Sequence, residues 1–291
     1  MKKLIVTGSG GQLGRAIRGR LGDQYTLIQT DIFDDENAGI RRLDITDVDQ
    51  VTALVRSEKP DGIVNCAAYT AVDAQEKDVE NSWKINALGP RNLAIAAEDA
   101  GVPLVHVSTD YVFAGDKPEP YTEFDTPGPV SVYGRTKLAG EQFVKEFSHR
   151  HYILRTAWLY GDGKNFAATM LRLAESHDEV SVVDDQIGNP TSAAELARAI
   201  EYLLPTENYG LFHATCEGSC SWADFAEEIF RLAGKTTRVT RLSSEEYAAR
   251  NPQSASRPKF SHLDKLMFRL TGDFRMCEWH DAIETYLQAN R

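Results

Sequence analysis

The sequence predicts a doubly wound α/β fold: a parallel, Rossmann-type sheet with helices on both faces, followed by a smaller C-terminal lobe. Short apolar runs alternate with helical patterns through the first half, and a glycine-rich turn joins the first run to the first helix. A chain of 291 residues is also long enough for one large domain and a small one. We expect a dinucleotide-binding domain over 1–160 and a mainly substrate-binding lobe over 161–291, with approximate and partly interleaved boundaries.

The first half contains the alternating elements of such a sheet. Each expected strand is a short apolar run, and these runs lie at 3–8, 25–30, 62–67, 103–109 and 152–161. The helical patterns between them lie at 12–21, 47–59 and 78–100, and another helix follows a turn-rich loop over 113–130.

The pattern loosens beyond residue 160. Helices are expected at 165–176, 192–204, 221–234 and 275–289, and short strands near 180–183, 211–214 and 237–240. The segment 241–262 is polar and rich in turn residues, so we expect it to be irregular.

Charge and cysteine content exclude several classes of protein. The net charge of −11 argues against a nucleic-acid binder, although helix N-termini could still bind phosphate. Neither a membrane-spanning run nor a signal peptide is recognisable, so we expect a cytoplasmic protein. The cysteines do not follow a zinc-binding spacing and are expected to be reduced thiols: Cys66, Cys216, Cys220 and Cys277.

The glycine-rich turn, TGSGGQLG at 7–14, predicts a dinucleotide site. Gly8 permits a tight turn, Gly11 lets the backbone approach a pyrophosphate, and Gly14 lets the helix pack closely on the sheet. The helix N-terminus adds free N–H groups and a positive dipole end. The alternative is that these glycines serve only a tight strand-to-helix turn.

An acidic residue, Asp31, directly follows the second expected strand. In a dinucleotide fold this position accepts hydrogen bonds from the adenosine ribose, although Asp31 could also be an ordinary loop acid. Asp44 and Asp47 follow in a turn that could lie against the adenine. Helix capping is an equally good interpretation of Asp47.

Tyr133 and Lys137 lie four residues apart at the start of a predicted helix. Their side chains would share one helix face, which in isolation is typical of an ordinary surface pair. The strand before this helix ends in Ser108, Thr109 and Asp110, and carboxyl ends of parallel strands border the ligand crevice. A hydroxyl, a phenol and an ammonium are therefore expected to converge beside a nicotinamide.

These groups suit carbonyl reduction. As hydride reaches the carbonyl carbon, the oxygen gains negative charge and needs a proton, which Tyr133 would donate. Lys137 would stabilise the phenolate and shift the pKa of Tyr133 toward neutral pH, and Thr109 would hold the carbonyl oxygen. The alternative, a nucleophilic Ser108 or Thr109, lacks both a G-x-S-x-G elbow and an evident histidine partner.

Several motifs together resemble the extended short-chain dehydrogenase/reductases and, more narrowly, the dTDP-4-dehydrorhamnose reductase family. The superfamily motifs are the GxxGxxG turn, NCAAYTAVD (65–73), STDYVF (108–113), YGRTK (133–137) and RTAWLYG (155–161). The likeness continues through KNFAATMLRLA (164–174), VVDDQIGNPT (182–191) and GSCSWADFA (218–226). YxxxK marks only the superfamily, whereas STDYVF combined with VVDDQIGNPTS is more specific to this family.

The resemblance implies reduction of the 4-keto group of dTDP-4-dehydro-L-rhamnose to dTDP-L-rhamnose, with hydride from NADPH or NADH. It implies catalytic roles for Tyr133, Lys137 and Thr109. The implied cofactor contacts are Gly8, Gly11, Gln12, Leu13, Gly14, Asp31, Asp44, Ile45, Ala67, Ala68, Tyr69, Tyr133 and Lys137. The implied substrate contacts are Val72, Thr109, Asp110, Trp158 and Arg257.

The resemblance leaves several alternatives open. Asn86 matches a superfamily position used for a water relay but could be an ordinary buried helix residue, and Arg257 could bind the substrate diphosphate or be solvated. Some relatives dimerise around magnesium held by an acid early in the first helix; here Arg15 and Arg18 stand there, so we expect no metal site. A monomer or homodimer is expected. Rival functions are reduction of another nucleotide-linked 4-keto-sugar and a non-catalytic regulatory subunit.

Overall fold

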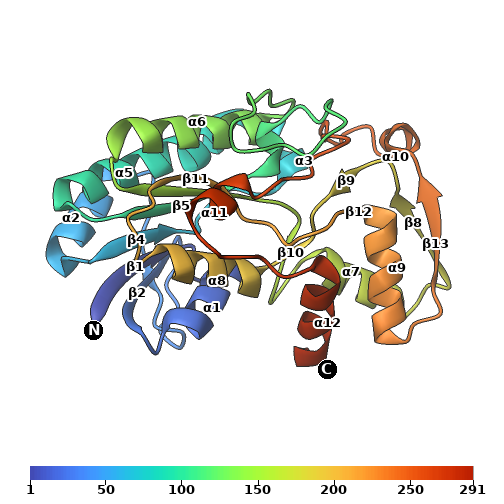
Figure 1. The fold of residues 1–291 in the computed structure, drawn as a ribbon, viewed down its shortest axis with the longest axis horizontal. Coiled ribbons are helices and arrows are strands. Elements are labelled where there is room, and N and C mark those ends of the chain that lie inside the picture. Colours follow the sequence, from blue (N-terminus) through green and yellow to red (C-terminus); the bar gives the residue numbers. More distant parts are fainter. Residues whose placement is uncertain (291) are drawn as a thin grey trace.

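The computed structural model describes residues 1–290 and contains the predicted parallel sheet with helices on both faces (Figure 1). Seven parallel strands lie in the order β11-β6-β5-β4-β1-β2-β3. Their bounds are β1 Lys2–Thr7, β2 Tyr25–Asp31, β3 Arg41–Arg42, β4 Gly62–Asn65, β5 Leu104–Thr109, β6 His151–Thr156 and β11 Gly210–His213.

The strand order places a switch point at the centre of the sheet. From β1 the chain adds β2 and β3 on one side, and then returns to add β4, β5 and β6 on the other. In open parallel sheets the ligand crevice lies at the carboxyl ends of the strands beside such a point. The expected site therefore lies where β1 ends at Thr7 and β4 ends at Asn65.

Alternating apolar side chains of the strands bury both faces of the sheet. On one face Leu4 and Val6 pack in a core with α1 (Gln12–Leu21) and α8 (Ala193–Leu203). On the other face Ile5 packs with the helices drawn together in the upper left of Figure 1. These helices are α2 Val48–Glu58, α5 Gly89–Ala100 and α6 Val132–Phe147.

A smaller lobe lies beside the sheet and has its own apolar core (Figure 1). Its helices are α7 Phe166–Leu173, α9 Trp222–Ala233, α10 Ser244–Arg250 and α12 Trp279–Ala289, and its two-stranded pair is β8 Glu179–Val183 with β13 Arg238–Leu242. Shorter elements complete the fold: α3 Val72–Gln75, α4 Val79–Trp83, α11 Leu266–Thr271, β7 Leu159–Tyr160, β9 Ile187–Gly188, β10 Thr191–Ser192 and β12 Cys220–Ser221.

Three expected elements differ from the structure. The strand expected over 152–161 is broken into β6 and β7 at Trp158, whose φ of +48° is incompatible with extended backbone. The helix expected over 78–100 contains a π-helical turn, Lys84–Leu88. The segment expected to be irregular contains α10, because Ser243 and Glu246 form a capping box.

The boundary at residue 160 stays a prediction, but parts of the second half of the chain pack with the first half. Helix α8 packs on α1, and β11 pairs with β6 to extend the large sheet. Residues 193–213 therefore lie with the elements of the first half. Within 1–290, the structure contains no helix that is long and apolar enough to cross a membrane.

Candidate active site

The glycine-rich turn between β1 and α1 is packed so closely that side chains would not fit. Gly8 has a φ of +65°, and a Cβ there would lie 2.7 Å from the backbone nitrogen of Ala67, at the end of β4. A Cβ on Gly14 would lie 2.4 Å from the Gly8 carbonyl oxygen. The turn thus brings backbone N–H groups and the N-terminus of α1 to the switch point, as an anion site requires.

Two contiguous cavities run along the carboxyl edge of the sheet, of about 570 and 370 Å³. They share Gly8, Gly11, Cys66 and Ala68. The larger cavity is lined by these predicted residues: Gly8, Gly11, Gln12, Leu13, Ala68, Val72, Thr109, Asp110, Tyr133, Lys137 and Trp158. The smaller one is lined by Gly8, Gly11, Asp31, Asp44, Ile45, Ala67 and Ala68.

The smaller cavity contains the carboxylate expected at an adenosine ribose. Asp31 already accepts two hydrogen bonds, from the Gly10 nitrogen at 2.9 Å and the Ile32 nitrogen at 2.8 Å. It therefore ties the end of β2 to the glycine-rich turn. Asp44 accepts from Thr46, while Asp47 caps α2 by accepting from the Asp49 and Gln50 nitrogens, which confirms the capping interpretation.

The structure brings Tyr133, Lys137 and Thr109 together in the larger cavity. Ser131 caps α6 by accepting from the Gly134 nitrogen, which starts the helix so that Tyr133 and Lys137 share the face over β5. The Lys137 ammonium is 2% exposed and donates to the Val107 carbonyl at 2.6 Å.

The titration of this pair corrects one expectation. Burial raises the pKa of Tyr133 to about 12, although a hydrogen bond with Thr109 opposes the shift, so Lys137 does not bring the phenol toward neutral pH. The physical reason is that a buried phenolate loses its hydration. Burial also lowers the pKa of Lys137 to about 8. Tyr133 is therefore neutral at physiological pH, and Lys137 is a cation that can lose its proton in mild alkali.

Asp110 lies beside this group and is almost fully buried. The Thr109 hydroxyl donates to Asp110 Oδ1 at 3.0 Å, and Ser261 also hydrogen-bonds to this carboxyl group. Burial raises the pKa of this carboxyl to about 6. A buried carboxyl group that lines a cavity can accept a hydrogen bond from a ligand hydroxyl.

A buried ion pair stands behind the site. Glu141, one turn beyond Lys137 on α6, accepts from Arg155 at 2.8 and 2.7 Å and from the Ser108 hydroxyl at 2.6 Å. The Ser108 hydroxyl is thereby committed to a carboxylate, which argues against a nucleophilic role. Sequence reasoning missed this pair, because its partners lie on different elements.

Two stacked tryptophans form part of the wall of the larger cavity. Trp158 and Trp222 have ring centroids 3.6 Å apart and planes inclined by 8°. Both line the cavity, as does Val72 at the start of α3. Trp222 was not predicted from the sequence, where a tryptophan following a capping serine carries no evident signal of function.

Three predicted residues line neither cavity: Gly14, Tyr69 and Arg257. Gly14 serves the packing of the turn, whereas Arg257 donates to Asp73 at 2.8 Å and to the Ala255 carbonyl. The backbone of Tyr69 is held by Asn86, which accepts from its nitrogen at 2.8 Å and donates to its oxygen at 3.0 Å. Asn86 also contacts Gln75, as expected of a buried structural asparagine.

Comparison with known proteins gives the family. The family profile for the RmlD substrate binding domain matches residues 1–291. The chain belongs to this family.

Relatives of the RmlD family match over nearly their whole length. A dTDP-4-dehydrorhamnose reductase of Sinorhizobium fredii is 38% identical over 294 residues, covering 96% of this chain and 95% of the relative. The crystal structure of a dTDP-4-dehydrorhamnose reductase from Clostridium acetobutylicum is 48% identical with a TM-score of 0.92, covering 99% of both chains. That of the Bacillus anthracis enzyme, in complex with NADP, is 43% identical with the same TM-score, covering 99% of this chain and 100% of the other.

Because the first helix of this chain is basic, we expect no metal site there. Arg15 there donates to the carbonyls of Gly10 and Asp162, so it clamps the glycine-rich turn to the loop after β7. Over residues 1–290, no group of three or more His, Cys, Asp or Glu side chains is arranged to hold a metal ion. The expectation of metal-independent turnover stays a prediction.

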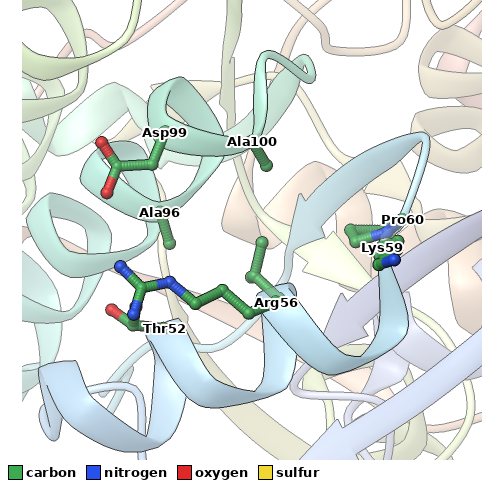
Figure 2. A pocket seen from close by; sticks show the side chains of 8 residues that line it. Thr52, Arg56, Lys59, Pro60, Ala96, Asp99 and Ala100 are labelled. Carbon is green, nitrogen blue, oxygen red and sulfur yellow. The ribbon is translucent and has the colours of Figure 1, made fainter.

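A further hollow of about 550 Å³ lies on the outer helices, away from the predicted residues (Figure 2). Thr52 and Arg56 of α2 line one side, and Ala96 and Asp99 of α5 line the other. These helices cover a face of the sheet rather than its carboxyl edge. The larger cavity at the carboxyl edge of the sheet, where several polar side chains converge, is therefore the better candidate for the active site of this chain.

Proposed function

We propose that this chain reduces the 4-keto group of dTDP-4-dehydro-L-rhamnose to give dTDP-L-rhamnose. The observation that carries the proposal is the meeting of Tyr133, Lys137 and Thr109 in one cavity that continues to the glycine-rich turn. A phenol, an ammonium and a hydroxyl are the groups that carbonyl reduction requires. The substrate is the one named by relatives that match over nearly the whole chain.

NADPH or NADH is the proposed cofactor, and when bound it supplies the hydride. The cradle fits a dinucleotide, since side chains on Gly8 or Gly14 would collide with backbone and the buried Gln12 Oε1 has no partner within residues 1–290. The Bacillus anthracis relative was crystallised with NADP. The residues proposed to hold the cofactor are Gly8, Gly11, Gln12, Leu13, Asp31, Asp44, Ile45, Ala67, Ala68, Tyr69, Tyr133 and Lys137.

Residues of this chain would supply the proton and stabilise the negative charge that its transfer leaves behind. Tyr133, neutral because burial raises its pKa to about 12, donates its proton to the carbonyl oxygen as that oxygen gains charge. Lys137, held by the Val107 carbonyl, stabilises the phenolate that remains. Thr109 turns its hydroxyl from Asp110 toward the same oxygen.

Substrate contacts are proposed at Val72, Asp110 and Trp158, which all line the larger cavity. Arg257 is proposed to reach the substrate diphosphate. It must exchange its ion pair with Asp73 to do so, and a diphosphate offers more charge in return.

Several broader features belong to the same proposal. The chain divides into a dinucleotide-binding lobe and a substrate-binding lobe near residue 160, acts in the cytoplasm as a monomer or homodimer, and supplies dTDP-L-rhamnose for cell-wall polysaccharide. It needs neither nucleic acid nor membrane.

The direct test follows NADPH oxidation with dTDP-4-dehydro-L-rhamnose. We expect turnover with this sugar, and much slower turnover with other nucleotide-linked 4-keto-sugars. Faster turnover of another keto-sugar would replace the substrate assignment. Coenzyme binding without any turnover would instead support a regulatory subunit.

A further inference from the structure

We propose that Trp222 is a positioning residue for the sugar: it fixes the Trp158 indole, and the stacked pair forms a rigid wall that orients the keto-sugar toward Tyr133. This inference rests on the proposed function, since it assigns the sugar to the larger cavity. Its evidence, however, is the geometry of the two indoles and of the segments that hold them.

The backbone at Trp158 has an unusual conformation. Its φ of +48° lies in the left-handed region, which a bulky residue rarely adopts. This conformation ends β6 after Thr156 and turns the chain before β7 starts at Leu159. Strained backbone of this kind persists only where surrounding contacts determine it, and such positions cluster at ligand sites.

Close contacts hold the Trp158 indole in place. One face of the Trp158 indole is covered by Trp222, with ring centroids 3.6 Å apart. Gly188 lies against the same indole so closely that an added Cβ would be 2.6 Å from Trp158 Cε2. Phe166 packs on Trp222 with ring centroids 4.5 Å apart. The Trp158 ring is thus gripped by Trp222 and Gly188, and Trp222 is itself backed by an aromatic ring.

Gly188 and Trp222, the two residues that contact the Trp158 indole, belong to one small structural unit. Strands β9 and β12 pair antiparallel, with Gly188 opposite Cys220 and Ile187 opposite Ser221. Ser221 then caps α9 in a capping box with Asp224, and it donates to Asp184 at 2.7 Å. Trp222 is the next residue, so its position is fixed by the cap that starts α9.

The stacked indoles form part of the wall of the cavity in which the sugar is proposed to bind. Both indoles line the larger cavity together with Asp110 and Tyr133. Because Trp222 covers one Trp158 face and Phe166 packs on Trp222, we infer that Trp222 acts mainly by holding Trp158. The stack then limits the orientations in which a sugar ring can lie beside the phenol. Loss of Trp222 should leave the coenzyme site, formed by other elements, unchanged.

The kinetic test is a double-mutant cycle on kcat/KM for the keto-sugar nucleotide, with coenzyme Kd measured in parallel. Trp222→Ala should lower kcat/KM by roughly 3- to 10-fold, in line with the value of one aromatic pair. In a Trp158→Ala background the same change should alter kcat/KM by less than about 2-fold. Additive losses would contradict the proposal, because Trp222 would then act independently of Trp158. A loss of coenzyme affinity would also contradict it.

Two further variants keep the proposal testable if Trp222→Ala folds poorly. Trp222→Phe should recover most of kcat/KM, because a phenyl ring still covers the Trp158 face. Gly188→Ala keeps Trp222 but pushes a methyl group into the Trp158 indole, so it should raise KM for the sugar nucleotide without changing coenzyme Kd. Wild-type kinetics in Gly188→Ala would refute the role of the gripped indole.

A spectroscopic arm is independent of turnover and so separates this proposal from the proposed function. Indoles stacked at this distance with transition dipoles that are not parallel give an exciton couplet in circular dichroism. It should be present in the wild type and in Trp83→Ala, whose indole is exposed on α4, and lost in Trp158→Ala and Trp222→Ala. A couplet that survives Trp158→Ala or Trp222→Ala would overturn the stacked wall, whereas a couplet that is lost in both variants, in an enzyme that does not turn over the keto-sugar, would overturn the proposed function and the sugar assignment but leave the stack intact.

Discussion

Replacing Glu141 with glutamine should destabilise the protein severely, although the change removes only one charge. Both carboxylate oxygens are buried and accept three hydrogen bonds, two from Arg155 and one from Ser108. The amide introduced by the substitution would direct N–H groups at the guanidinium or the hydroxyl, and Arg155 would be left as a buried charge without its counter-ion. Breaking such a pair costs about 3–5 kcal/mol.

Thermal unfolding measures this cost. For a chain of this size about 1 kcal/mol shifts Tm by about 2–4 °C, so Glu141→Gln should lower Tm by roughly 10 °C. The matched control is Glu80→Gln, which breaks an exposed i,i+4 pair with Lys84 and should shift Tm by no more than about 1 °C. Replacing both buried partners, Glu141→Leu with Arg155→Met, should recover much of the loss. If Glu141→Gln melts within about 2 °C of the wild type, the buried ion pair contributes little to the stability of the fold.

The remaining predictions concern the coenzyme, the metal and the pH profile. Both coenzymes should be used, and Asp31→Ala should shift the ratio of their kcat/KM values toward NADPH, because the carboxylate repels a 2′-phosphate; equal effects on both would remove Asp31 from the ribose site. Turnover should survive EDTA without added magnesium, and activity lost in EDTA and restored by magnesium would contradict this. Because burial lowers the pKa of Lys137 to about 8, kcat/KM should fall as pH rises through about 8, where the cation loses its proton. A profile that stays flat through that region would exclude a charged Lys137 from catalysis.

The large sheet could be predicted because its strands are buried on both faces and read as apolar runs. The break at Trp158 could not be predicted, since its backbone is left-handed and the residues that contact its ring, Trp222 and Gly188, come from distant segments. The place of β11 in the large sheet depends on pairing with β6, a long-range contact that local patterns do not report. Helix α10 was missed although its capping box, Ser243 to Glu246, is visible in the sequence.

The positions of the candidate catalytic groups could be predicted, but their electrostatics could not. Spacing places Tyr133 and Lys137 on one helix face, and topology places Thr109 beside them. The direction of the Tyr133 pKa shift depends on how much water the surrounding chain removes, which the sequence does not state. The Glu141–Arg155 pair was likewise missed, because it joins α6 to β6 through the core.

Tyr133 is proposed to give the proton, and comparing Tyr133→Phe with the wild type tests this role most directly. The change removes one oxygen from a site that holds coenzyme mainly through the glycine-rich turn, so coenzyme Kd should hardly change. With dTDP-4-dehydro-L-rhamnose, kcat should fall by about 10²–10⁴, as expected for a positioned proton donor. Lys137→Met, by contrast, should impair both coenzyme binding and kcat. Near-normal kcat in Tyr133→Phe would show that Tyr133 is not the proton donor and would make Asp110 the next candidate.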